Sequence, residues 1–278
     1  MALHADVGDL KAGDFDCGSP SNAPPLIEAR NISKAFAAPH GEVVALRDVS
    51  FDIQRGEFVS IVGQSGCGKS TLMRIIAGLI PRSAGSLTMD GRQIDGPTGE
   101  CAIVFQAPVL LPWRNTLDNI LLPLEFRGVR RAGDVARARD LLQTVGLKDF
   151  ANAHPYELSG GMQQRVAIAR ALIQDPQLIL MDEPFGALDA MSREQMNQEL
   201  LRIWTLAGNT VIFITHSVAE AVLLSDRVIA MSARPGTIAE IIEISLPRPR
   251  DLSVINTPEF GAYTQRLRRL LNAEGTMF

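Results

Sequence analysis

A glycine-rich stretch that lies between an apolar run and a helical run could hold phosphate groups. Residues 63–71 read G-Q-S-G-C-G-K-S-T and fit the pattern G-x-x-x-x-G-K-[ST]. Glycines allow backbone N–H groups to turn toward phosphate oxygens, and the N-terminus of the next helix adds a positive dipole. In this pattern Lys69 reaches the β- and γ-phosphates and Ser70 ligates Mg²⁺. The nucleotide-binding residues expected in this phosphate loop are Gly63, Ser65, Gly66, Cys67, Gly68, Lys69, Ser70 and Thr71.

Two adjacent carboxylates that follow a short apolar run could act on a phosphate group. The run at 178–181 predicts a buried strand, and Asp182 and Glu183 come directly after it. Ligands bind at the carboxyl ends of strands in open α/β sheets. Phosphoryl transfer needs a metal on the phosphate oxygens and a group that orients the attacking nucleophile. We therefore expect Asp182 to hold Mg²⁺ and Glu183 to polarise water. An ordinary strand-end turn is the alternative, which the nearby phosphate loop disfavours.

A second pair of glycines lies far along the chain, again before a predicted helix. Residues 158–165 read L-S-G-G-M-Q-Q-R, and the helix is expected to begin near Gln163. Such glycines can form another anion cradle, although a plain helix cap would have the same pattern. One nucleotide needs only one cradle for its phosphates. Ser159, Gly160 and Gly161 are therefore expected to serve a nucleotide that is bound to another copy of the chain.

Short apolar runs predict the strands that must position these residues. Four runs predict a small antiparallel sheet that leads into a buried strand: residues 26–29, 43–46, 49–53 and 58–62. Four further strands are expected to be parallel and covered on both faces, because each run is short and apolar: residues 102–105, 178–181, 211–215 and 228–231. The expected fold class is α/β with a mainly parallel sheet and an N-terminal antiparallel β subdomain.

The remaining segments predict an inserted helical subdomain and two flanking extensions. No strong strand pattern falls between residues 108 and 160, and residues 134–145 place apolar side chains on one helical face. A Pro-rich link at 247–250 precedes a final helical stretch at 264–271. The expected organisation is a disordered tail at 1–25, a main domain at 26–240 with its helical subdomain at about 107–162, and a C-terminal extension at 241–278.

Composition excludes several classes of protein. Hydrophobic residues make up 46% and charged residues 21% of the chain, which is an ordinary globular balance. This balance excludes a collagenous, coiled-coil or wholly disordered protein. The net charge of −4 disfavours a general nucleic-acid-binding protein. No apolar run reaches the length of a membrane span. Cys17, Cys67 and Cys101 form no C-x-x-C pair, so neither a disulfide framework nor a zinc site is indicated, and a reducing, cytosolic setting is the simplest interpretation.

Over residues 26–240 these motifs occur in the order typical of the ATP-binding-cassette (ABC) ATPase family, which the chain resembles. The resemblance implies a P-loop NTPase core of the RecA-like type, with ATP and Mg²⁺ as ligands and ATP hydrolysis as the reaction. It implies that Phe36 stacks on adenine, that Gln106 joins Lys69 and Glu183 in catalysis and also ligates Mg²⁺, and that His216 is the switch histidine. From the residues alone, Phe36 could be a core aromatic, Gln106 a loop amide and His216 a structural histidine.

The resemblance also implies a second copy of the chain as a partner. Two ATP molecules would lie between two chains arranged head to tail, each between the phosphate loop of one chain and residues 159–161 of the other. Leu188 and Asp189 match the D-loop of the family. A homodimer is the default expectation for a chain that carries one cassette.

Three hypotheses describe what such an ATPase would drive. The first is a membrane transporter with a separate permease, the second a DNA- or ribosome-acting ATPase, and the third a cassette that binds nucleotide without turnover. The third is disfavoured because Lys69, Asp182, Glu183 and His216 are all present. The second is disfavoured because the chain has no second cassette and no long basic tract, so we expect no nucleic-acid partner.

The segment after Gln106 favours the transporter hypothesis. Residues 107–120 combine apolar and aromatic side chains with prolines, as in an exposed partner site, although a buried helix lead-in has a similar composition. The family resemblance implies that this region receives the permease, with Trp113 and Arg114 as candidate contacts. The same segment and residues 231–236 resemble the nitrate, sulfonate and taurine importer group. That implies a peripheral subunit at the cytoplasmic face of the inner membrane and an external substrate-binding protein; a thiamine pyrimidine precursor is an alternative substrate.

Overall fold

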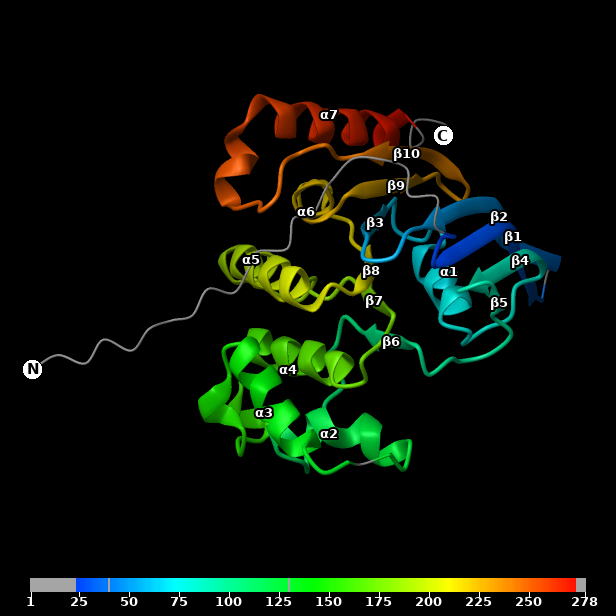
Figure 1. The fold of residues 1–278 in the computed structure, drawn as a ribbon. Helices are drawn as coiled ribbons and strands as arrows, with labels where there is room; N and C mark the ends of the chain where they lie inside the picture. The colour runs from blue at the N-terminus through cyan, green and yellow to red at the C-terminus, as the bar shows by residue number, and fades with distance from the viewer. Residues whose placement is uncertain (1–23, 40, 130, 274–278) are drawn as a thin grey trace, which may run out of the picture.

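The computed structural model describes residues 24–39, 41–129 and 131–273. Two sheets form the frame of the molecule (Figure 1). The larger one has six strands in the order β10-β9-β3-β8-β7-β6, in which only β10 runs antiparallel to its neighbour. Its strands are β3 (Phe58–Val62), β6 (Cys101–Val104), β7 (Leu178–Asp182), β8 (Thr210–Ile214), β9 (Arg227–Met231) and β10 (Ile238–Glu243).

The smaller sheet is antiparallel and comes from the N-terminal part of the described chain. Its strand order is β2-β1-β4-β5. The strands are β1 (Ile27–Ala38), β2 (Gly41–Ile53), β4 (Ala84–Met89) and β5 (Arg92–Gln93). This arrangement confirms the expected α/β fold class with an N-terminal antiparallel subdomain.

Helices surround the larger sheet and also form a separate group below it in Figure 1. They are α1 (Lys69–Ile76), α2 (Thr116–Phe126), α3 (Asp134–Thr144), α4 (Gly160–Leu172), α5 (Ala190–Ala207), α6 (Val218–Leu224) and α7 (Pro258–Ala273). Three short 3-10 helices occupy connections: η1 (Lys148–Phe150), η2 (Pro155–Glu157) and η3 (Leu252–Asn256). Between residues 108 and 160 the described chain holds helices and no strand, as expected. In the described part of the chain, none of the helices has the length and apolar character needed to cross a bilayer.

The central strands separate two hydrophobic cores because alternate side chains of a strand point to opposite faces. Phe58 of β3 and Phe213 of β8 face one core, which continues into the helical group through residues such as Ile120. Ile61 of β3 and Ile214 of β8 face the other core, which is shared with the antiparallel sheet and α1. Every residue of β3 and β8 is buried, so the strand ends that carry the candidate site are held in place from both faces.

Several boundaries differ from the sequence expectations. β1 continues past Ala29 through a bulge at Asn31, which adopts a φ of 51° and breaks the alternation of buried residues. Strands β4, β5 and β10 were not expected from the sequence, because their side chains are largely exposed or half-buried. α7 begins at Pro258 rather than near residue 264. β10 crosses residue 240, so the C-terminal extension shares a strand with the main sheet.

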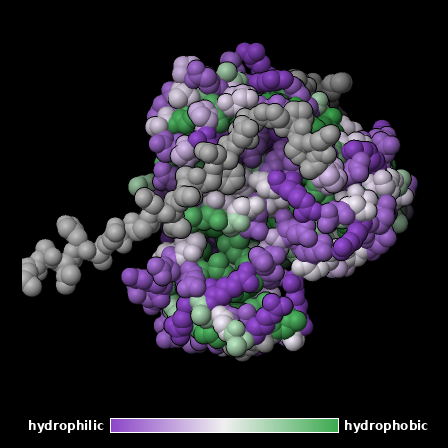
Figure 2. All heavy atoms as spheres, viewed as in Figure 1, coloured by the Kyte–Doolittle hydropathy of each residue, from purple (hydrophilic) through white to green (hydrophobic). Residues whose placement is uncertain are grey.

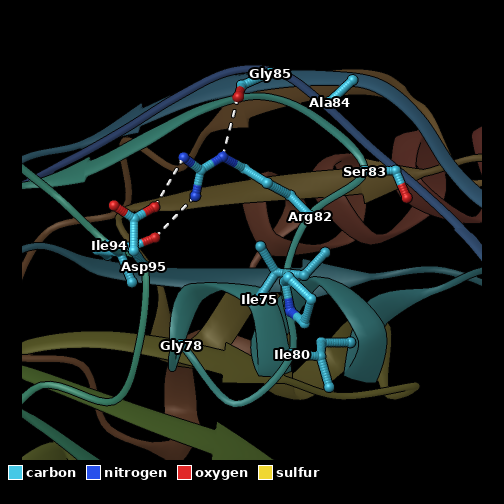
Figure 3. A pocket seen from close by; sticks show the side chains of 10 residues that line it. Ile75, Gly78, Ile80, Arg82, Ser83, Ala84, Gly85, Ile94 and Asp95 are labelled. Carbon is cyan, nitrogen blue, oxygen red and sulfur yellow. Dashed lines mark hydrogen bonds and ion pairs between the residues drawn. The ribbon is translucent and has the colours of Figure 1, made fainter.

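Arg82 joins the connection after α1 to the antiparallel sheet. Its guanidinium donates to the carbonyl oxygens of Gly85 (3.0 Å) and Ile94 (2.8 Å) and pairs with Asp95 at 3.2 Å (Figure 3). These bonds cross a small pocket that Ile75 of α1 also lines. The smaller sheet is thereby tied to the helix that begins at the phosphate loop.

Candidate functional site

The phosphate loop lies between β3 and α1, as expected. Gly68 is the N-cap residue of α1 and has a φ of 108°, a conformation that side-chain-bearing residues rarely adopt. A Cβ atom there would lie 2.7 Å from Cδ2 of Leu46 and 3.0 Å from the carbonyl oxygen of Ala45. Both neighbours belong to β2, so the antiparallel sheet closes directly onto the loop. Close contact with β2 therefore keeps the loop backbone in a tight turn, as a phosphate cradle requires.

The ammonium group of Lys69 is held against this loop. Its Nζ donates to the carbonyl oxygens of Gly63 (2.9 Å) and Gln64 (3.0 Å), and the side chain is almost fully buried. The positive charge thus sits at the N-terminus of α1, where the helix dipole also favours an anion. Cys67 is buried beside it, with Sγ 4.0 Å from Nζ, and burial raises the pKa of the thiol. The side chain of Cys67 therefore packs inside the loop as a small apolar residue.

The expected metal-binding residues Ser70 and Asp182 meet beside the loop. The Ser70 hydroxyl donates to Oδ1 of Asp182 at 3.2 Å, which joins α1 to the end of β7. Burial raises the pKa of Asp182, and the hydrogen bond from Ser70 opposes that shift. In the described residues no group of three His, Cys, Asp or Glu side chains gathers as a metal cage. A hydroxyl and a carboxylate nevertheless fit Mg²⁺, which takes few protein oxygens and completes its shell with phosphate and water.

Glu183 and His216 come together at the ends of the neighbouring strands β7 and β8. Oε2 of Glu183 lies 3.3 Å from Nδ1 of His216. Glu183 has a φ of 46° and donates its backbone N–H to the carbonyl oxygen of Ile214 at 2.9 Å. Non-glycine residues in this region are strained, and such strain is concentrated at functional sites. The carboxylate is partly open and the imidazole is exposed, so the pair can reach water and hold or move a proton.

Gln106 reaches the same edge of the sheet from the end of β6. A Cβ atom on Gly186 would lie 2.9 Å from Nε2 of Gln106 and 3.3 Å from the carbonyl oxygen of Glu183. Gly186 also donates its N–H to that carbonyl at 3.0 Å. The Gln106 amide therefore lies against the turn that follows Glu183, and its oxygen is a ligand type that Mg²⁺ accepts.

Phe36 projects from the antiparallel sheet near the phosphate loop. It pairs with Val43 of β2, two residues before Ala45, which contacts Gly68. The ring is 41% exposed, which excludes the alternative of a core aromatic. Nζ of Lys34 lies 5.0 Å from the centre of the ring. An exposed aromatic face beside a phosphate cradle is suited to stacking on a nucleobase.

The second cradle lies at the N-terminus of α4, on the helical group. Ser159 caps the helix by accepting a hydrogen bond from the N–H of Met162 at 3.3 Å, and Ser159 and Gly160 are exposed. A Cβ atom on Gly160 would lie 3.8 Å from Leu188 just before α5, and Gly161 is open. Figure 2 shows hydrophobic residues gathered between α4 and α5. The contacts of this cradle are with α4 and the turn before α5, while the phosphate loop contacts β2, so the two cradles are held by different parts of the chain.

Sequence reasoning missed a charged pair behind His216. Arg193 of α5 lies 3.5 Å from Oε1 of Glu220 of α6, and Oε2 of Glu220 accepts a hydrogen bond from the Thr215 hydroxyl at 2.6 Å. Burial raises the pKa of Glu220, against the opposing effects of Thr215 and Arg193. The sequence does hint at this pair, because Glu220 is the single charged residue in α6, which is otherwise apolar.

The segment after Gln106 forms an ordered loop with exposed apolar side chains. Arg170 of α4 donates to the carbonyl oxygens of Pro108 (2.7 Å) and Val109 (2.8 Å). The buried side chain of Asn119 accepts from the N–H of Leu111 at 2.8 Å and donates to the carbonyl oxygen of Arg114 at 3.0 Å. The exposed apolar members of this loop, residues 105–114, are Phe105, Val109 and Trp113.

Trp113 and Arg114 differ in their surroundings. Trp113 is 73% exposed, so the expectation of an exposed segment is confirmed and the buried helix lead-in is excluded. Arg114 pairs with Glu125 of α2 at 2.6 Å. Trp113 is therefore available to a partner, while Arg114 also holds the loop against α2.

Comparison with known proteins agrees with this geometry. Residues 46–186 match the family model described as ABC transporter. A taurine import ATP-binding protein of Rhizobium johnstonii is 46% identical over 254 residues, covering 89% of this chain and 97% of the relative. A nitrate import ATP-binding protein of Synechocystis sp. is 41% identical over 256 residues, covering 90% of this chain and 96% of the relative.

A solved structure shows the same fold. It is the dimeric post-hydrolysis state of the ATP-binding cassette MJ0796 bound to ADP and Pi, with a TM-score of 0.69 and 34% identity. The match covers 80% of this chain and all of that chain. The chain therefore belongs to the ABC transporter family and is an ATP-hydrolysing member of it.

Proposed function

We propose that this ATPase is the nucleotide-binding subunit of a membrane importer for taurine, nitrate, a sulfonate or a similar small anion. The names of two relatives support the substrate class. The observation that carries the transporter role is the ordered apolar loop at 105–114, with Trp113 at its surface. Several apolar and aromatic side chains exposed on one ordered loop are typical of a partner site.

The loop has the properties of a docking site for a permease. Hydrogen bonds from Gln164 to the carbonyl oxygen of Phe105 (3.2 Å) and from Arg170 to Pro108 hold the backbone from behind. A partner would therefore bind a surface that is already ordered, which lowers the entropic cost of association. Aromatic residues such as Trp113 frequently dominate such interfaces. The loop also contains Gln106, so movement of the permease would be coupled to the nucleotide site through one short segment.

The ATP site uses the residues assembled around the phosphate loop. The triphosphate would lie on residues 63–71 with Lys69 beside the β- and γ-phosphates, and Phe36 would stack on adenine. Ser70, Asp182 and Gln106 would hold Mg²⁺, which would neutralise phosphate charge when bound. Glu183 orients and polarises the attacking water from its place beside His216. His216 can share the proton that Glu183 receives, because the two side chains are 3.3 Å apart.

Two copies of the chain complete the site. Each ATP would meet the phosphate loop of one copy and Ser159, Gly160 and Gly161 of the other, in a head-to-tail homodimer. The exposed N-terminus of α4 supports this assignment, because its own chain does not bring it to the phosphate loop. ATP would favour the closed pair because the γ-phosphate binds both copies, and hydrolysis would release them.

A location and partners follow from this role. The subunit works at the cytoplasmic face of the inner membrane, bound to the permease and only indirectly to an external substrate-binding protein. We further infer that residues 26–240 form the ATPase domain, with residues 107–162 as its helical subdomain and 241–278 as an extension. Residues 1–23 of the predicted tail lie outside the described residues.

Purification of the tagged chain from detergent-solubilised native membranes tests the proposal. We expect a polytopic permease in near-stoichiometric amount. Trp113→Ala should lose this partner while the isolated chain keeps its ATP turnover. Tyr156→Ala is the matched control, since Tyr156 is 75% exposed outside the loop.

Two outcomes would redirect the proposal. Recovery with ribosomes or DNA, and without a permease, would favour the alternative of an ATPase that acts on those assemblies. A permease that accumulates a pyrimidine precursor of thiamine, and neither nitrate nor a sulfonate, would keep the importer role and replace the substrate class.

A further inference from the structure

A charged pair lies between α5 and α6, next to the catalytic edge of the sheet. Glu220 is buried, with 8% of its side chain exposed, and Arg193 lies against it at 3.5 Å. A carboxylate in an apolar helix is costly unless its partners satisfy it. Solubility therefore does not explain a charged pair at this buried position. The pair contacts two segments near the site, the loop that carries His216 and the turn before α5.

Glu220 is tied to the loop that carries His216. The Thr215 hydroxyl donates to Oε2 of Glu220 at 2.6 Å, and the same hydroxyl oxygen accepts from the N–H of Ser217 at 2.9 Å. The Ser217 hydroxyl in turn caps α6 by accepting from the N–H of Glu220 at 3.3 Å. The residues on both sides of His216 are thus bonded to one carboxylate and to the first turn of its helix.

Arg193 is tied to the turn before α5. Its Nη2 donates to the carbonyl oxygen of Leu188 at 3.2 Å. The next residue, Asp189, caps α5 through bonds to the N–H and hydroxyl of Ser192 at 3.0 and 2.6 Å. Leu188 itself lies 3.8 Å from the Cβ position of Gly160. Arg193 therefore contacts the segment beside the cradle that the other copy would use.

One donor of the pair is unsatisfied in this structure. Nε of Arg193 is buried, and no atom of the described residues accepts a hydrogen bond from it. Its nearest carboxylate oxygen is Oε1 of Glu220, at 3.5 Å. Buried donors without an acceptor are rare, so a small shift of α5 toward α6 would be stabilised by a new charge-assisted bond.

We propose that Arg193 and Glu220 are positioning residues that link the turn at Leu188 to the orientation of His216 against Glu183. Movement of the Leu188 turn when two copies close is transmitted through Arg193 to Glu220, and through Thr215 to the His216 loop. The inference rests on the proposed catalytic roles of Glu183 and His216. It adds a connection between the surface that faces the second copy and the proton-handling pair.

A double-mutant cycle on ATP hydrolysis tests the link. In the wild-type background Arg193→Ala should lower kcat about tenfold and leave the KM for ATP within about twofold, because nucleotide contacts are unchanged. Arg193→Lys should restore part of the loss, since it keeps the charge without the guanidinium fork. In a His216→Ala background the same Arg193→Ala change should alter kcat by less than about twofold, because the imidazole that the pair orients is absent.

Controls separate this inference from a purely structural role and from the proposed catalytic roles. Arg202→Ala removes an exposed arginine of the same helix that pairs with Glu199, and it should leave kcat unchanged. Glu220→Gln, which can still accept from Thr215, repeats the test if Arg193→Ala does not fold. An Arg193→Ala loss of equal size in both backgrounds, or no loss in a folded variant, would overturn the link. A His216→Ala variant with full turnover would instead refute the catalytic role of His216.

Discussion

Substitution of Arg250 should show how much the contacts between the C-terminal extension and the ATPase domain contribute to the free energy of unfolding. Its guanidinium is buried and donates to carbonyl oxygens at the end of α6 and after β10. Three of these bonds are 3.0 Å or shorter: to Ser225 (2.7 Å), Leu246 (2.9 Å) and Ile244 (3.0 Å). Arg250→Ala removes all three and leaves the carbonyl oxygens buried.

The size of the effect follows from these bonds. A hydrogen bond within a protein contributes about 1 kcal/mol net, and somewhat more when one partner is charged. Three such bonds to a cation at the C-terminus of a helix give an expected loss of about 3 to 5 kcal/mol in the free energy of unfolding. Arg250→Lys should lose a smaller part, since one ammonium cannot reach all three carbonyls.

Urea denaturation followed by circular dichroism measures this loss. Arg268→Ala, a change at an exposed arginine of α7, is the matched control and should stay within about 0.5 kcal/mol of the wild type. A loss below about 1 kcal/mol for Arg250→Ala would refute the reasoning. Loss of α7 alone, with the rest of the chain still folded, would show that Arg250 holds only the extension.

Of three further predictions, two concern the nucleotide site and one concerns the buried Glu220. Phe36→Ala should raise the KM for ATP roughly tenfold with little change in kcat, because base stacking is lost. Phe126→Ala, at the exposed end of α2, should change neither. An unchanged KM would remove Phe36 from the site. Gly236→Ala should weaken ATP binding more than tenfold, since its Cβ would lie 2.0 Å from the carbonyl oxygen of Cys67; Gly96→Ala, which has open space, is the control for calorimetric titration. Equal affinities for the two variants would contradict this packing. Burial raises the pKa of Glu220 above its usual 4.5, so the folded state binds a proton there more tightly than the unfolded state. The resulting contribution to the free energy of unfolding is fully present below pH 4.5 and is lost as the pH rises through the raised pKa. Urea midpoints of Glu220→Gln should therefore fall less than those of the wild type as the pH rises above 4.5, and parallel curves would contradict the shift.

The sequence was informative where chemistry and local structure coincide. The phosphate loop needs glycine at position 68 and a lysine at the start of a helix, and both requirements are visible in residues 63–71. Strands β3 and β8 are buried on both faces, so their apolar runs are continuous and easily recognised. These features predicted the α/β class and the phosphate loop, while the pairing of β7 with β8 beside that loop was seen only in the structure.

Other features depend on tertiary contacts that no local pattern records. β10 is an edge strand whose residues are mostly half-buried or exposed, so its apolar pattern is weak. Arg193 and Glu220 are 27 residues apart in the sequence and meet only because α5 and α6 pack together. Arg114 is a residue type that often contacts partners, so the sequence indicated only a surface role for it. Its ion pair with Glu125 of α2 forms only in the folded loop.

Nucleotide-dependent pairing of the Glu183→Gln variant tests the central claim most directly. The change keeps the size of the side chain and removes the carboxylate proposed to polarise water, so ATP should bind and remain unhydrolysed. With ATP and Mg²⁺, light scattering should give a mass near twice the 30.2 kDa of one chain, and with ADP the mass of a single chain. A variant that hydrolyses ATP at the wild-type rate, or that remains a monomer with ATP bound, would contradict the account.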